Sequence, residues 1–142
     1  MAFKIENSEK IIKSWLQFIE PMIKNSNSVA ILGFGNGKHI SDLIQKYTLS
    51  EIHVVDPSTR TIETSFLNVS MNFHYYTKMN SITILKRILQ NSIQPIPVLC
   101  FRPCWNSDSL FFESTLTELI AEKEIKNWNN STANFILESL FL

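Results

Sequence analysis

The sequence lacks the features of nucleic-acid-binding and membrane proteins. Its 142 residues carry 13 basic and 13 acidic side chains, so the chain has no electrostatic footprint for a phosphate backbone. No apolar stretch reaches the roughly 18 residues of a membrane span, and the N-terminus has no basic region followed by an apolar run. We therefore expect a cytoplasmic protein that binds neither nucleic acid nor membranes.

Cysteine is also scarce. The two cysteines, Cys100 and Cys104, have no histidine or second cysteine pair beside them at the spacing of a zinc site. We interpret both as buried structural thiols and predict no metal site. A nucleophilic Cys104 would need activation, for which Arg102 two residues away is a weak indication, so a packed thiol is the stronger interpretation.

What the chain does contain is enough apolar surface for one core. Hydrophobic residues make up 44% of it, including ten Phe and three Trp, and its length is typical of one domain, here residues 1–142. Strand-like and helix-like segments alternate, which predicts right-handed crossovers. We expect an α/β fold of the Rossmann-like class: a mostly parallel sheet in the order third, second, first, fourth, with helices on both faces.

The expected elements follow from the spacing of apolar residues and from helix-breaking residues. An amphipathic helix opens the chain, with Pro21 in its last turn. The C-terminal segment 135–142 is either a last element on the core or an apolar dimer surface. The predicted strands cover 29–32, 52–55, 73–76 and 98–101, and the predicted helices cover 8–23, 38–47, 60–69, 82–89 and 112–120.

Glycine is rare, and its placement is the most informative feature of the sequence. All three glycines lie within five residues: Gly33, Gly35 and Gly37. They join the first strand to a helix, which is the context that Gly-X-Gly-X-Gly requires. Glycine permits positive φ and close approach, and backbone amides at the helix start, including that of Asn36, favour a polar or anionic group. We interpret residues 28–56 as a nucleotide-type binding unit for a small-molecule ligand.

Two side chains are expected to complete this site at the carboxyl edge of the sheet. Asp56 closes the second strand, near the roughly 20-residue offset from Gly33 at which a carboxylate meets ribose hydroxyls. Arg102 follows the fourth strand and suits a phosphate or carboxylate. The alternatives are structural: Asp56 opens an Asx-turn before Pro57, Arg102 pairs with a helix residue such as Glu113, and the glycines only pack strand against helix.

Four further side chains are candidates for chemistry. His39 lies in the first turn of the glycine-loop helix and is expected to face solvent or cap the helix, with a ligand contact as the alternative. His53 and His74 lie within strands beside apolar residues, which indicates packed neutral imidazoles with no obvious dyad. Trp105 is expected to cover the edge of the core, and stacking on a base is the alternative.

The segment from Val29 to Gly37 resembles the first motif of class I S-adenosylmethionine-dependent methyltransferases, a hydrophobic strand that runs into Gly-X-Gly-X-Gly. Asp56 matches that family's ribose-binding acidic residue, which implies S-adenosylmethionine or another adenosine-containing ligand. The chain departs from the family at Ile31, where an acidic residue is common. It also departs at 102–105, where many amino-methylating members carry Asp/Asn-Pro-Pro-Tyr/Phe. We therefore expect ligand binding rather than catalysis.

A second resemblance covers about residues 28 to 120. The chain is similar to the N-terminal Rossmann-like region of bacterial motility accessory factors, proteins linked to flagellin glycosylation. The resemblance rests on residues 33–40, on 54–57, and on 102–105 followed by a helix rich in Leu and Phe. In that family the larger domain thought to do the transfer chemistry lies outside this region. The resemblance implies a non-catalytic accessory module. The apolar segment 135–142 further suggests that such a module binds a protein partner, or itself as a homodimer, through its aromatic surface.

Overall fold

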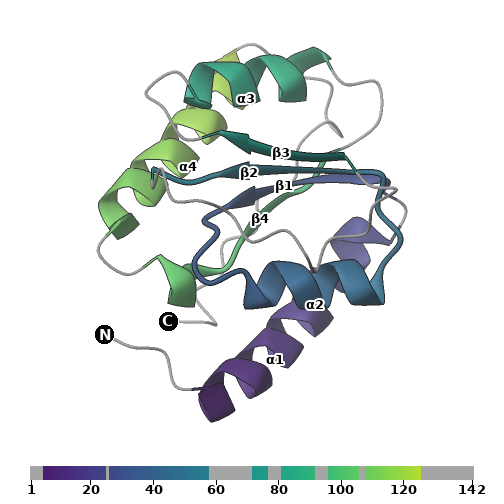
Figure 1. Cartoon of the computed structure of the whole chain (residues 1–142). Helices are drawn as coiled ribbons and strands as arrows, with labels where there is room; N and C mark the ends of the chain where they lie inside the picture. The colour runs from purple at the N-terminus through teal and green to yellow at the C-terminus, as the bar shows by residue number, and fades with distance from the viewer. Residues whose placement is uncertain are drawn as a thin grey trace.

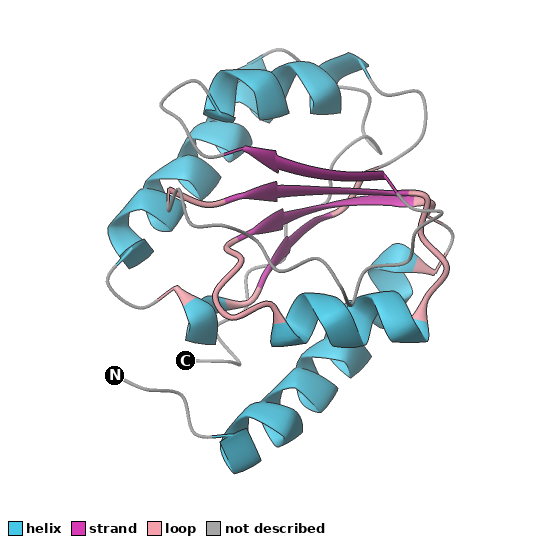
Figure 2. Cartoon of the chain, viewed as in Figure 1, coloured by secondary structure: helices cyan, strands magenta, loops and turns pink. Residues whose placement is uncertain are grey.

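The protein is built on a parallel four-stranded sheet between two layers of helices (Figures 1 and 2). The computed structural model describes residues 5–24, 26–57, 72–76, 81–91, 96–105 and 108–125. The strands are β1 (Ser28–Leu32), β2 (Glu51–Val55), β3 (Asn72–Tyr76) and β4 (Val98–Cys100). The helices are α1 (Ile5–Ile23), α2 (Lys38–Lys46), α3 (Ser81–Asn91) and α4 (Ser109–Ile125), with a short 3₁₀ helix η1 (Arg102–Cys104) after β4.

The predicted α/β class and strand order are confirmed. The order is β3-β2-β1-β4, and every pairing between these strands is parallel. The predicted strands and helices that fall on described residues are all present, with their ends shifted by a few residues. The predicted helix 60–69 and the C-terminal segment 135–142 lie outside the described residues.

The helices bury one face each against the sheet. In α1 the apolar residues expected at helical spacing, such as Ile12 and Ile19, are buried, and Pro21 lies in the last turn as predicted. Trp15 anchors α1, because its indole Nε1 donates a hydrogen bond of 3.0 Å to the carbonyl of Cys100 at the end of β4. None of the helices in the described part of the chain is long and apolar enough to cross a membrane.

The sheet divides the core into two halves. Val29 and Ile31 pack with α1 and α2 on one face, whereas Ala30 and Leu32 pack with α3 and α4 on the other. Because both faces are covered, β1 is an uninterrupted apolar run rather than an alternating one. Figure 1 shows the two helix layers on either side of the strands.

The strand order creates a switch point at β1. The chain leaves β1 toward β2 and β3 on one side and later returns to β4 on the other side. β1 and β4 are neighbouring strands, and the helices that follow them, α2 and α4, pack on opposite faces of the sheet. Open α/β sheets bind their ligands at such a point, beyond the carboxyl ends of the strands. The glycine turn and Arg102 both lie at this edge.

Candidate functional site

The turn after β1 takes its shape from three glycines with positive φ. The φ angles are 102° at Gly33, 56° at Gly35 and 82° at Gly37, a region that other residues adopt only at a steric cost. Gly37 is the N-cap of α2 and has no side chain to cap it. Asn36 takes over part of this role, because its Oδ1 accepts a hydrogen bond of 3.0 Å from the amide of Lys38. The predicted strand, glycine turn and helix are confirmed.

Asp56 ties this turn to β2. Its buried carboxylate accepts a hydrogen bond of 2.8 Å from the amide of Phe34, and the amide of Gly33 donates to the carbonyl of Val55 at 2.8 Å. The carboxylate thus stabilises the conformation of the glycine turn. This contact with Phe34 is neither a ribose contact nor the Asx-turn ahead of Pro57, and the sequence did not reveal it.

Side chains from the segment after β4 fill the inner side of the turn. A Cβ added to Gly33 would lie 2.9 Å from Cδ1 of Trp105, and one added to Gly35 would lie 2.7 Å from Cβ of Cys104. Trp105 is fixed by a hydrogen bond of 2.8 Å from its Nε1 to the carbonyl of Leu32. Trp105 therefore covers the core edge as predicted. Together with Cys104 it occupies the space beside the glycines at the switch point.

Arg102 lies at the expected edge of the sheet, but its guanidinium already forms an ion pair within the chain. Its guanidinium forms an ion pair with Glu113 of α4 and lies 5.7 Å from the centre of the Trp105 ring. The sequence left open whether Arg102 pairs with a ligand or with Glu113, and the structure contains the pair with Glu113. An anionic ligand would have to compete with that carboxylate.

His39 was predicted to face solvent or cap the helix, and that prediction is wrong. Its ring is buried, stacks on Phe101 at a centroid distance of 4.7 Å, and meets the edge of Trp15 at 5.5 Å. The first turn of α2 lies close to the sheet, so the side chain at position 39 faces the core. Burial lowers the pKa of His39 to about 4, and the hydrogen bond to Gly33 offsets only part of this effect. The ring is therefore neutral at pH 7.

The neighbouring thiol of Cys104 does not form a catalytic pair with His39. Its Sγ lies 4.0 Å from His39 Nε2, which is itself 3.3 Å from the carbonyl oxygen of Gly33. A carbonyl only accepts hydrogen bonds, so Nε2 carries the proton and has no lone pair for the thiol. A thiol activated by histidine needs such a lone pair or an imidazolium. Cys104 is half-buried and Cys100 is buried, so the predicted burial holds fully only for Cys100.

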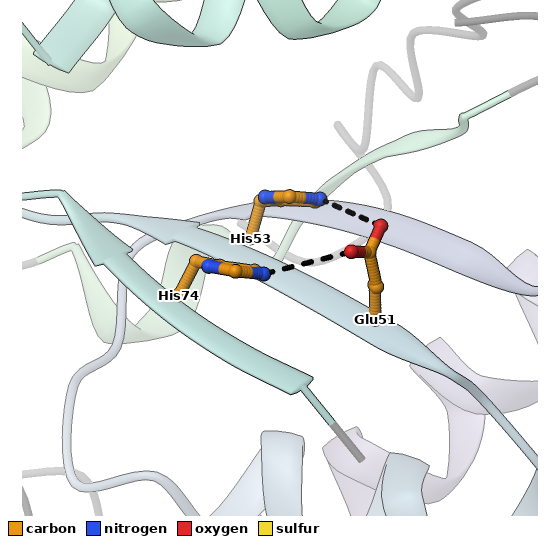
Figure 3. Close-up of side chains that lie close together, drawn as sticks. All are labelled: Glu51, His53 and His74. Atoms are coloured by element: carbon orange, nitrogen blue, oxygen red, sulfur yellow. Dashed lines mark ion pairs between the residues drawn. The ribbon is translucent and has the colours of Figure 1, made fainter.

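A second polar cluster, formed by Glu51, His53 and His74, lies elsewhere on the sheet (Figure 3). Parallel pairing places His53 beside His74, and their rings stack at a centroid distance of 4.7 Å. Glu51 is on the same face, two residues before His53, and its carboxylate oxygens lie 3.5 Å from His53 Nε2 and 3.6 Å from His74 Nε2. The prediction that these histidines show no dyad is wrong.

The two histidines differ in their surroundings. His53 is buried as predicted, but the side chain of His74 is 41% exposed because β3 is at the edge of the sheet. Burial, and to a smaller extent His74, lowers the pKa of His53 despite the nearby Glu51. The hydroxyl of Tyr76 lies 2.9 Å from His53 Nδ1, and its ring stacks near both imidazoles. Burial and the charge of Glu51 raise the pKa of Tyr76, so it stays protonated at pH 7.

A shallow depression of about 360 Å³ is lined by residues of α1 and α2. Its lining is a mixture of charged and polar side chains around one leucine. It holds none of the predicted site residues. The lining residues are Glu9, Lys13, Leu16, Asp42, Gln45 and Lys46.

No protein-family model matches the chain, and neither a curated protein nor a solved structure matches it. The resemblances to methyltransferases and to motility accessory factors therefore stay predictions from short motifs.

Proposed function

We propose that this domain binds an adenosine-containing compound or another nucleotide-like ligand at the carboxyl edge of its sheet, without catalysing a reaction there. One arrangement carries the proposal: the glycine turn, Asp56 and the segment from Arg102 converge where β1, β2 and β4 end. In Rossmann-like folds this edge, at the switch point of the strand order, is where ligands bind.

The exposed rim of the turn is the surface that suits the ligand. Cys104 and Trp105 fill the inner side, whereas Asn36 is exposed and Gly35 is half-buried. The positive end of the α2 helix dipole favours a phosphate or carboxylate at this rim, and a ligand would replace Asn36 as the acceptor for the amide of Lys38. Lys38 lies at the same helix start and pairs with Asp42 at 3.0 Å. An exposed pair of this kind is weak, so an anionic ligand can recruit the ammonium of Lys38.

The absence of catalysis in this proposal follows from the groups at the edge. His39 is buried and neutral, and its Nε2 proton is directed at the carbonyl of Gly33. The carboxylate of Asp56 is buried and bound to the amide of Phe34. Neither group is placed to move a proton to or from a ligand at the rim. Ile31, at the position where many methyltransferases carry an acidic residue, agrees with a binding role.

Calorimetric titration tests this proposal with S-adenosylmethionine, S-adenosylhomocysteine, NAD and ATP as ligands. We expect at least one of them to bind with one site per chain. Lys38→Ala should weaken that binding, whereas Lys46→Ala, which removes an exposed lysine from the other end of α2, should not. Absence of binding by all four compounds, or equal affinities of the two lysine variants, would count against the proposed site.

A second candidate function is a non-catalytic accessory module that uses the Rossmann shape without a small ligand. One observation favours it: Cys104 and Trp105 already pack against the glycines, and Glu113 already neutralises Arg102. The chain's own side chains therefore already contact the glycines and the guanidinium at this edge. This candidate predicts no binding in the titrations together with self-association of the intact chain. Light scattering on the intact chain and on a truncation after Thr132 measures this, and a monomer in both would contradict self-association.

A further inference from the structure

The cluster of Glu51, His53 and His74 is separate from the glycine turn. Glu51 is the first residue of β2, so the cluster begins at the amino end of the strand, whereas the glycine turn follows the carboxyl end of β1. Its side chains share the sheet face of Val55, which packs with α3 and α4. A ligand bound by this cluster is therefore independent of ligand binding at the glycine turn.

The three side chains present one ligand atom each to a common point. One ring nitrogen of each histidine and a carboxylate oxygen lie within 4.8 Å of one another, and both imidazoles direct Nε2 toward Glu51 (Figure 3). Bonds of roughly 2.0 to 2.2 Å to a zinc ion would place such atoms about 3 to 3.6 Å apart. Oε1 of Glu51 lies 3.5 Å from His53 Nε2 and Oε2 lies 3.6 Å from His74 Nε2, so each nitrogen is already in this range of one carboxylate oxygen.

Binding of one ion requires the two nitrogens to approach each other and one carboxylate oxygen of Glu51 to face both. The imidazole planes are nearly parallel, at 9°, so one ring has to tilt before both lone pairs meet at one ion. His53 is held in place because its side chain is only 6% exposed. His74 has the freedom to tilt, because it lies on the edge strand β3 and its side chain is 41% exposed.

The nitrogens themselves indicate a ligand. Nε2 of His53 and Nε2 of His74 are buried atoms that make no hydrogen bond to any group in the described part of the chain. Their contacts with Glu51 are longer than an ordinary hydrogen bond. Buried polar atoms normally have a partner, so two such atoms aimed at one carboxylate point to a missing ligand between them.

Tyr76 supplies the support that metal-binding histidines usually have. Its hydroxyl oxygen lies 2.9 Å from Nδ1 of His53. When Nδ1–H donates to this oxygen, the proton is fixed on Nδ1 and the lone pair of Nε2 faces Glu51. Such partners on the second ring nitrogen orient the ring and set its tautomer.

We propose that Glu51, His53 and His74 bind one divalent transition-metal ion, with zinc as the expected ion and Tyr76 as the positioning residue. Two imidazoles and a carboxylate suit zinc and its first-row neighbours, whereas calcium and magnesium prefer all-oxygen sites. Three protein ligands leave at least one coordination position for water or a small molecule. Glu51 and His74 are both about 40% exposed, so the cluster lies close to solvent at the edge of the sheet although both Nε2 atoms are buried.

The test uses the intact chain without a histidine tag. Calorimetric titration with zinc chloride should give one site per chain, and cobalt(II) should produce a visible d–d absorption band when it binds. His74→Ala and Glu51→Gln should each raise the Kd for zinc by more than the roughly tenfold that loss of a supporting hydrogen bond causes. Glu20→Gln is the matched control, because Glu20 is also an exposed glutamate in an ion pair but lies on α1.

Circular dichroism and urea unfolding without metal separate ligand loss from unfolding. Both His74→Ala and Glu51→Gln replace partly exposed side chains, so we expect them to keep the fold. Tyr76→Phe should weaken zinc binding less than loss of a ligand does, and by about tenfold. Three results would overturn the proposal: no stoichiometric zinc binding, unchanged affinity in the folded His74→Ala and Glu51→Gln variants, or a cobalt–thiolate charge-transfer band that places the ion at a cysteine.

Discussion

Gly35 and Cys104 approach each other so closely that a Cβ on the glycine would lie 2.7 Å from the Cβ of the cysteine. The two residues come from the loops after β1 and β4, which meet at the switch point of the sheet. The glycine pattern therefore serves internal packing as well as the shape of the turn. This double use is the reason that a Gly-X-Gly-X-Gly pattern alone does not establish a ligand site.

The first prediction concerns this contact. Gly35→Ala should lower the free energy of unfolding by about 1 to 3 kcal/mol, because alanine is strained at positive φ and its Cβ meets Cys104. Urea unfolding measures the loss. Cys104→Gly in the same chain removes the clashing Cβ, so part of the loss caused by Gly35→Ala should disappear in that background. An unchanged unfolding midpoint for Gly35→Ala would contradict the packing.

The second prediction concerns the carboxylate that holds the turn. Asp56→Ala should lower the free energy of unfolding by about 2 kcal/mol, because it leaves the buried amide of Phe34 without its acceptor. Asp56→Asn keeps an acceptor oxygen of the same size and should lose less. Chemical unfolding of the two variants side by side tests this. Equal losses in the free energy of unfolding would contradict a stabilising role for the acceptor oxygen of residue 56.

The third prediction is a pH dependence from His39. Its pKa is about 4 in the folded state, below the ordinary histidine value of 6.5 that applies to the unfolded chain, so the unfolded chain binds more protons between these values. The contribution of His39 to stability is therefore complete above pH 6.5 and is lost as the pH falls toward 4, by at most about 3 kcal/mol. Urea unfolding at about pH 7.5 and about pH 4.5 measures this loss, and His39→Gln corrects for carboxylates that titrate in the same range. A loss of the same size in His39→Gln would show that other groups cause it.

The fourth prediction concerns Arg102. Glu113→Gln removes the carboxylate that neutralises its guanidinium, so the affinity for ATP at the glycine rim should rise if Arg102 contacts the phosphates. Glu118→Gln, on the same helix, releases Lys86 instead and serves as the control. Calorimetry compares the two variants. Equal ATP affinities for them would remove Arg102 from the proposed site.

Much of the fold could be predicted from the sequence. The apolar run of β1 and the apolar spacing of α1 each report on the local chain, and the alternation of strands and helices then implies the parallel order. The position of Gly33, Asp56 and Arg102 at one edge also followed from that order. These features depend on local pattern and on general rules of topology.

The contacts between residues far apart in the sequence could not be predicted from local patterns. The burial of His39 depends on how close α2 lies to the sheet, and the contact between Gly35 and Cys104 depends on two loops far apart in the chain. The contact between His53 and His74 came closest to being predictable from the sequence. Each is the second residue of its predicted strand, 52–55 or 73–76, and neighbouring parallel strands in that register bring the rings together. The sequence alone does not give the register between β2 and β3, so this contact was not predicted.

The scarcity of glycine offers the most direct test of ligand binding at the turn. All three glycines lie in it, so selective labelling with ¹⁵N-glycine gives an NMR spectrum in which every amide signal reports on the proposed site. Titration with the S-adenosyl compound or nucleotide that binds in calorimetry should shift these signals, most strongly that of Gly35, and the shifts should saturate with the calorimetric affinity. Glycine signals that stay in place while the ligand binds would contradict a site at the glycine turn.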